Sequence, residues 1–248
     1  MANSKCYVSF KNKMSHFDAD LEYVDIVYNN ILSTPLPTGA TELFPGSSNP
    51  KYEILSRYKV VPQNQLLVIR HCRATLFTAY IKELYEEFPM YLMNMLKDIY
   101  NNAKITPERL TGEHRISMSS TDILTHIRQG DIADIVIDNI FQCLENERST
   151  IALISKFHQK IGIEKNDALI NDAIYYLEIR HKLVHTDGFA DSEFISSHQT
   201  LTYTASNYIS LNYTTIKNAK NSVMALVKDM DSKIMQKQLV PPNTTPTS

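Results

Sequence analysis

The side chains best suited to chemistry lie near the end of a predicted helix, in the run from Glu178 to Gly188. This run contains Arg180, His181 and His185. A histidine has an ordinary pKa of about 6.5 and can exchange protons near neutral pH. An arginine keeps its positive charge and offers a planar set of donors that suits a phosphate group. We therefore take Arg180 and His185 as candidate catalytic residues for proton transfer next to a phosphate.

These residues belong to a helix that we expect to begin near Asn166 or Asp167, either of which can cap it, and to end near His185. Its apolar side chains form one stripe, made of Ile170, Ala173, Ile174, Leu177 and Val184. His181 falls on this stripe, and Arg180 and His185 lie at its edges. Because polar groups at such positions cost stability in a core, we expect the stripe to face a second copy of the chain, with the polar groups lining a cleft.

Two other interpretations of the same residues remain open. Basic side chains in the last turn of a helix interact favourably with its dipole, and Gly188 is placed as an ordinary helix stop. His181 and His185 are also four residues apart, as in zinc hydrolases. Those enzymes carry Glu directly after the first His, however, and Lys182 stands at that position here. With no third-ligand motif in the sequence, we expect neither a metal nor a cofactor.

The composition indicates a helical protein. The chain has 248 residues, among which are only 6 Gly and no Trp, and no Pro occurs between Pro107 and Pro241. Sheets with tight turns use Gly and Pro freely, so an all-β or Gly-rich nucleotide-binding fold is disfavoured. No apolar run approaches the roughly 18 residues of a spanning helix, and the N-terminus lacks the apolar core of a signal peptide. The three dispersed cysteines are Cys6, Cys72 and Cys143. They favour a reducing compartment, so we expect a cytoplasmic protein without a membrane partner.

The apolar spacing and the Gly and Pro residues predict the order of elements. We expect helices over residues 17–32, 64–100 (with a possible kink at Pro89), 121–130, 131–144, 150–161, 167–185 and 214–236. Residues 33–62 are a proline-rich connecting loop, residues 101–120 a polar loop and residues 208–211 an extended segment. The predicted fold is all-α, a bundle of five or more helices with an N-terminal helical extension. The predicted division is 1–62 for the extension and loop, 63–240 for the helical domain and 241–248 for a disordered tail.

The motif Arg180-His181-x-x-x-His185 at the end of a helix resembles the signature of the HEPN superfamily. The segment from Leu66 to Leu84 resembles the first helix of the RNase-LS-like toxin branch, and the segment from His185 to Phe194 is similar to that branch as well. The resemblance covers roughly residues 65–235 and implies a HEPN-like helical bundle. An acidic residue common in the first helix of relatives is replaced by Thr78, and Glu83 is its nearest substitute.

This resemblance implies a metal-independent endoribonuclease that cleaves RNA by attack of its own 2′-OH. It further implies a homodimer in which each copy contributes Arg180 and His185 to a shared cleft. The implied biological role is that of a toxin or antiphage-defence effector, whose partner protein would be an antitoxin or another component of the defence system. His181, Asp187 and Glu83 are the implied supporting residues. Some relatives carry a Tyr at the position of Asp187, and adenylylation of that Tyr silences the toxin. Because position 187 is Asp in this chain, we do not expect this control here.

The best candidate RNA-binding surface comes from residues 54–82, which contain no Asp or Glu. Its cations are Arg57, Lys59, Arg70, Arg73 and Lys82. The formal net charge of −2 gives no general attraction to RNA, so any affinity for phosphate must be local. The alternative function is a catalytically silent HEPN-like adaptor that binds a partner protein or a small ligand through the same cleft.

Overall fold

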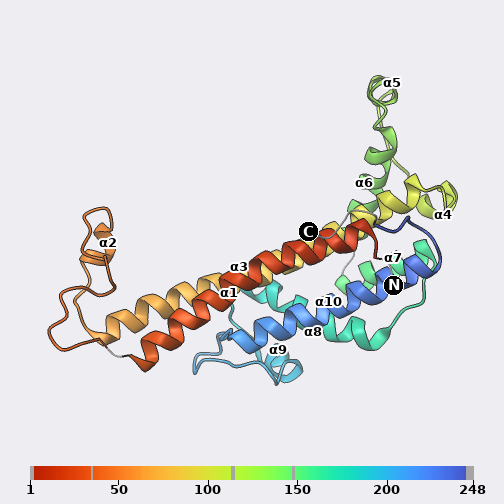
Figure 1. The fold of residues 1–248 in the computed structure, drawn as a ribbon. Coiled ribbons are helices and arrows are strands. Elements are labelled where there is room, and N and C mark those ends of the chain that lie inside the picture. Colours follow the sequence, from red (N-terminus) through yellow and green to blue (C-terminus); the bar gives the residue numbers. More distant parts are fainter. Residues whose placement is uncertain (1–2, 35, 113–114, 147–148, 244–248) are drawn as a thin grey trace. The chain divides into compact units, whose positions relative to one another are not determined.

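The protein is all-α, as predicted. The computed structural model describes residues 3–34, 36–112, 115–146 and 149–243. Within these ranges there are ten helices and no strand, and two isolated antiparallel bridges join Phe189 to Tyr208 and Tyr203 to Ile209. The helices (Figure 1) are α1 Lys5–Ser33, α2 Glu53–Ser56, α3 Pro62–Asn101, α4 Pro107–Thr111, α5 Ser120–Gln129, α6 Ile132–Glu145, α7 Thr150–Ile161, α8 Asp167–His185, α9 Ser192–Ser197 and α10 Tyr213–Gln236.

The chain divides into two compact units, neither of which is continuous in sequence. Unit 1 comprises residues 1–14, 83–181 and 218–248, and unit 2 comprises residues 15–82 and 182–217. The division falls inside α1, α3, α8 and α10, so each of these helices contributes to both units. A domain boundary near residue 62 therefore stays a prediction.

In unit 1, the beginning of α1 packs antiparallel against the second part of α3. The rings of Phe10 and Tyr91 lie 5.8 Å apart, and the Cys6 thiol donates a hydrogen bond to the Asp98 carboxylate at 3.1 Å. Rising residue numbers on α1 thus meet falling numbers on α3. Burial and the neighbouring carboxylates raise the pKa of Cys6. Cys6 is therefore a protonated hydrogen-bond donor and not a reactive thiolate.

The same antiparallel arrangement occurs in unit 2. The rings of Phe17 and Tyr80 lie 5.7 Å apart, edge to face, and Arg73 forms an ion pair with Asp25 at 2.8 Å. Tyr80 is almost completely buried. The core of this unit is completed by further buried side chains, among them Leu21, Leu43, Ile69, Phe77, Ala190, Phe194, Leu201 and Ile216.

The first helix begins twelve residues earlier than predicted. It starts at Lys5, whereas the apolar spacing had indicated a start near Phe17. Tyr7, Phe10 and Met14 are buried in unit 1. These three residues recur at steps of three and four, which is the spacing of a helix face. This spacing could have predicted that the helix includes the lysine-containing N-terminal segment.

Most other helix ends agree with the predicted ones to within one or two residues. The hydroxyl of Ser149 accepts a hydrogen bond from the Ala152 N–H at the start of α7, and Gly162 ends this helix with a φ of 72°. Helix α3 is continuous through Pro89. Helices α2, α4 and α9, of four to six residues each, lie in segments predicted as loops.

No helix in the described ranges combines the length and apolar character needed to cross a membrane. At the C-terminus, Val240 is buried, and the Asn243 N–H donates a hydrogen bond to the Asn3 carbonyl at 2.8 Å. The predicted disordered tail covers residues 241–248, of which 244–248 lie outside the described residues.

A buried carboxyl group makes the stability of unit 1 depend on pH. Asp231 of α10 is 2% exposed, and only its Oδ2 atom has a partner, the Ser4 N–H at 3.3 Å. Burial raises the pKa of Asp231 above its ordinary value of 3.8. The proton is thus held more tightly in the folded than in the unfolded chain. The stabilisation is complete below pH 4 and is lost as the pH rises through the raised pKa.

We predict that Asp231→Asn increases the free energy of unfolding relative to wild type at pH 7. The amide keeps an oxygen acceptor for Ser4 but removes the cost of burying a charge. Because wild-type Asp231 is neutral in acid, this advantage should shrink toward pH 4. Urea unfolding of both proteins at several pH values checks the prediction, which is wrong if the difference between them does not change with pH.

Candidate functional site at the end of α8

Helix α8 carries the motif predicted from the sequence. Its start is fixed by Asn166, whose side-chain oxygen accepts a hydrogen bond from the Leu169 N–H at 3.3 Å. Ile170, Ala173, Ile174 and Leu177 of the predicted stripe are buried, and so is Ile179.

The stripe does not stay buried to the end of the helix. Val184 is 38% exposed, and His181 and His185 are exposed as well. Since the chain itself covers the earlier part of the stripe, a second copy could meet only this last turn. Ile179, on the opposite side of the helix from Ile170, is completely buried. Near its end, α8 therefore buries a different side of the helix, the side of Ile179, while the side of Val184 becomes exposed. The apolar stripe alone did not predict this change.

Arg180 is a half-buried cation in unit 1. Its guanidinium carbon lies 4.7 Å from the centre of the Tyr85 ring of α3. Its Nε atom is buried and has no hydrogen-bond partner in the described part of the chain, and the guanidinium forms no ion pair there. Glu83, the predicted supporting carboxylate, is half-buried on the same part of α3 and does not form an ion pair with Arg180. Arg180 is thus held by an aromatic ring without a neutralising carboxylate.

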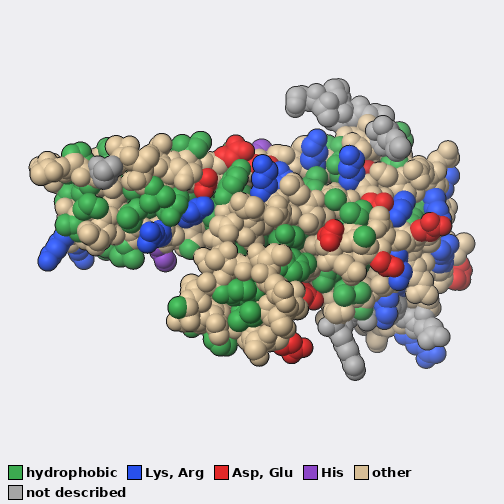
Figure 2. All heavy atoms as spheres, turned by 90° about the horizontal axis from the view of Figure 1, so that it is seen from below, with side chains coloured by type: hydrophobic (Ala, Val, Ile, Leu, Met, Phe, Trp, Pro, Cys, Tyr) green, Lys and Arg blue, Asp and Glu red, His purple; other side chains and the backbone are tan. Residues whose placement is uncertain are grey.

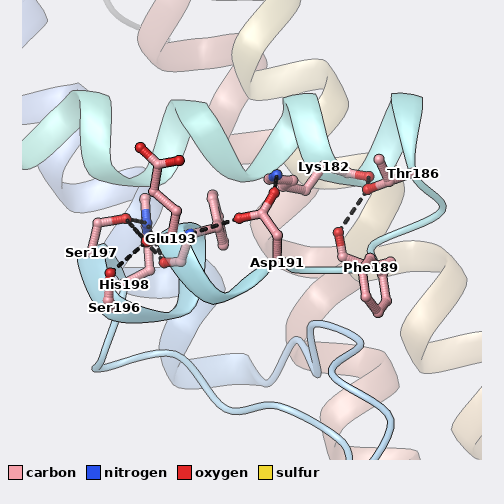
Figure 3. A network of polar contacts seen from close by, with 9 residues as sticks. Lys182, Thr186, Phe189, Asp191, Glu193, Ser196, Ser197 and His198 are labelled. Carbon is pink, nitrogen blue, oxygen red and sulfur yellow. Dashed lines mark hydrogen bonds and ion pairs between the residues drawn. The ribbon is translucent and has the colours of Figure 1, made fainter.

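His185 is the last residue of α8 and belongs to unit 2, where the helix end is closely defined. The Gly188 N–H donates a hydrogen bond to the Lys182 carbonyl at 2.9 Å, with a φ of 50° at Asp187 and of 85° at Gly188. The Thr186 hydroxyl lies 2.7 Å from the Phe189 carbonyl (Figure 3). This left-handed closure confirms Gly188 as the helix stop. It places Asp187, the other predicted supporting residue, exposed in the turn after His185.

A second connection, which was not predicted from the sequence, joins the end of α8 to α9. Lys182 forms an ion pair with Asp191 (Figure 3). Its ammonium also lies 5.3 Å from the centre of the Phe194 ring. Asp191 also accepts a hydrogen bond from the Phe194 N–H at 2.8 Å and so caps α9. The hydrogen bond from Lys182 and the cap lower the pKa of Asp191. An Asp three residues before an apolar residue was the available signal for this cap.

Ser197 and His198 lie close together but do not form a nucleophile–base pair. His198 is 2% exposed and its ring stacks on Phe194, with centroids 3.9 Å apart. Its Nδ1 atom lies 3.0 Å from the Ser197 hydroxyl and 3.2 Å from the Phe194 carbonyl (Figure 3). A buried ring held by its own helix end cannot reach a substrate, so this contact is structural.

The predicted RNA-binding cations all lie in unit 2 but differ in their surroundings. Lys59 and Arg70 are exposed, and their side-chain cations have no partner in the described residues. Arg57 is exposed and forms an ion pair with Glu53 at 3.3 Å. Lys82 is half-buried.

Arg73 differs from the other four. Its guanidinium forms an ion pair with Asp25 and lies 4.2 Å from the Tyr28 ring and 5.0 Å from the Phe77 ring. These contacts hold α1 against α3 within unit 2. The sequence placed Arg73 among surface cations because a contact with Asp25 leaves no local pattern.

No group of three or more His, Cys, Asp or Glu side chains within the described ranges is arranged to hold a metal ion. The zinc interpretation of His181 and His185 therefore has no third ligand in these residues.

Comparison with known proteins gives no match: no protein-family model, no curated protein and no solved structure matches this chain.

We predict that Gly188→Ala destabilises the protein by about 1 kcal/mol, because its φ of 85° is unfavourable for residues with a Cβ. A Cβ there would lie 3.5 Å from Leu183, an ordinary contact, so the backbone conformation is the main cause. Gly188→Asn should cost less, since Asn tolerates positive φ better than Ala. Chemical denaturation of both variants tests this, and equal stability of Gly188→Ala and wild type would contradict it.

Proposed function

We propose that this protein is a metal-independent endoribonuclease of the HEPN type. It cleaves RNA by attack of the 2′-OH on the neighbouring phosphate, with Arg180 and His185 as catalytic residues. The proposal rests on the sequence resemblance, and the surroundings of Arg180 support it.

The structural observation that supports the proposal is a half-buried arginine that has no carboxylate partner among the described residues. Arg180 is held over Tyr85, and its Nε atom is buried without a hydrogen-bond partner among the described residues. Such a group is unusual in a purely structural role, because buried charged groups are normally paired. A phosphate supplied by the substrate would provide the missing charge and accept hydrogen bonds from the planar guanidinium.

Each residue then has a defined chemical task. Arg180 binds the phosphate and stabilises the extra negative charge of the transition state. His185, exposed at the last position of α8, moves a proton between the 2′-OH or the leaving oxygen and water. His181, Asp187 and Glu83 are supporting residues that tune charge around this pair.

The resemblance further leads us to propose a homodimer in which each copy supplies Arg180 and His185. The last turn of α8, with His181, Val184 and His185, is exposed. This exposure supports the proposal that a second copy of the chain contacts this surface. The biological role proposed is a toxin or antiphage-defence effector restrained by a partner protein. Cytoplasmic RNA is its substrate.

We predict that purified protein cleaves RNA in the presence of EDTA. His185→Ala should lose about 10²- to 10⁴-fold in rate, the usual range for acid–base catalysis, and Arg180→Ala about 10²- to 10³-fold, the range for loss of a group that stabilises transition-state charge. Arg180→Lys should recover little, because an ammonium lacks the planar donor set. Arg128→Ala and His16→Ala replace exposed residues of the same types and serve as matched controls. If His185→Ala cleaves RNA as fast as wild type, the site assignment is wrong.

We also predict that expression of the wild-type chain arrests bacterial growth and that Arg180→Ala and His185→Ala do not. The physical reason is that loss of either group removes cleavage without removing the folded protein, whose amount is checked by immunoblotting. Growth curves with matched expression give the measurement. Unimpaired growth with wild type, together with no cleavage in vitro, would instead favour the silent HEPN-like adaptor.

A further inference from the structure

We propose that the α2 segment, defined as residues 49–64, is a docking site for single-stranded RNA. Its tyrosines stack on bases and its cations contact phosphates. The residues concerned are Tyr52 and Tyr58 for stacking and Lys51, Arg57 and Lys59 for phosphate contacts. This inference rests on the proposed function for its biological meaning, because it assigns the substrate a second point of attachment in addition to the catalytic pair.

The two tyrosines of the α2 segment are exposed. Tyr52 is 43% and Tyr58 is 37% exposed. The ring of Tyr58 has no aromatic or cationic partner among the described residues, and the ring of Tyr52 is contacted only by the ammonium of Lys51, at 4.8 Å. Free aromatic faces next to cations are the usual means of binding single-stranded nucleic acid without base preference.

The charge around these rings is positive. Between residues 51 and 82, Glu53 is the one acidic residue. Its ion pair with Arg57 is exposed, with side-chain exposures of 73% and 71%. Exposed pairs of this kind contribute little free energy, so Arg57 can exchange Glu53 for a phosphate. Lys59 has no partner to give up.

The backbone of the α2 segment is held in place before any ligand binds. The Tyr58 N–H donates to the Leu55 carbonyl at 3.2 Å, and the Asn64 side chain donates to the Lys59 carbonyl at 2.9 Å. The Gln65 side chain donates to the carbonyl of Leu43, which is 2% exposed and anchors the preceding loop. Ordering of the segment therefore adds little entropic cost to binding.

The neighbouring surface of unit 2 offers the opposite environment. On α1, Tyr23 is 68% exposed, but Asp20 and Glu22 lie beside it in sequence, and no Lys or Arg occurs from residue 14 to residue 50. In Figure 2, Lys and Arg side chains (blue) lie among hydrophobic ones (green) at the left of the view, the side on which Figure 1 labels α2. Tyr23 is thus a matched control in the same unit with negative surroundings.

One exposed side chain of the segment suits a membrane better than RNA. Ile54 is 65% exposed, and an aliphatic group beside cations could enter an anionic lipid surface. The unpaired aromatic faces and the lack of a longer apolar face on the four-residue α2 favour RNA. Ile54→Ser separates the two occupants.

The test is binding of a short fluorescein-labelled oligouridylate, measured by fluorescence anisotropy with full-length His185→Ala so that cleavage does not interfere. Tyr58→Ala should weaken binding about five- to a hundredfold, the range for loss of one stacked base. Tyr58→Phe should bind like the parent protein, because it keeps the ring. Tyr23→Ala and Ile54→Ser should also leave the affinity unchanged.

Salt dependence gives a second measurement on the same proteins. Lys59→Gln should flatten the slope of log affinity against log salt by about 0.7, the value for one phosphate contact on a single strand. Equal affinity of Tyr58→Ala and its parent, with unchanged circular dichroism, would overturn the proposal. The proposal would also be overturned if the protein did not bind oligouridylate but sedimented with phosphatidylserine vesicles, and if Ile54→Ser abolished that sedimentation. Binding is measured without cleavage. The RNA-docking proposal can therefore hold even if the proposed nuclease activity is absent, and the nuclease activity can hold even if the α2 segment does not bind RNA.

Discussion

The antiparallel pairing of α1 with α3 is the constraint on which both units depend. In each unit the pairing is made by an aromatic contact and a polar one: Phe10 with Tyr91 in unit 1, and Phe17 with Tyr80 in unit 2. Since α3 also supplies Tyr85, the ring beneath Arg180, the position of the candidate catalytic arginine follows from the position of this helix. The candidate motif thus lies on α8, and its arginine is supported by α3.

The end of α8 is determined by local geometry of a different kind. Left-handed backbone at Asp187 and Gly188 stops the helix directly after His185, and the ion pair between Lys182 and Asp191 ties the following loop to the last turn. This loop is joined to residues 207–209 by backbone hydrogen bonds. Together these contacts leave His185 exposed on a well-defined end, which suits a group that exchanges protons with a substrate and with water.

Local sequence patterns explain which parts of this structure could be predicted. Helix α7 agrees with the prediction because a serine cap, an apolar period and a terminal glycine all indicate the same bounds. Helices α2 and α9 are too short to show a period. Arg180 was recognisable as a candidate from its spacing to His185, but its contact with Tyr85 was not, because tertiary partners distant in sequence leave no local pattern.

The distribution of charge explains how a chain of nearly neutral net charge could act on a polyanion. Four of the nine acidic residues of unit 2 lie on α1, whereas six of its eight Lys and Arg residues lie between residues 51 and 82. Arg73 and Asp25 join these two sets, so part of the positive charge is used in packing. The remaining cations attract phosphate only over about a Debye length. An RNA substrate of the proposed kind would then be bound through local contacts, since a net charge of −2 provides no general electrostatic attraction.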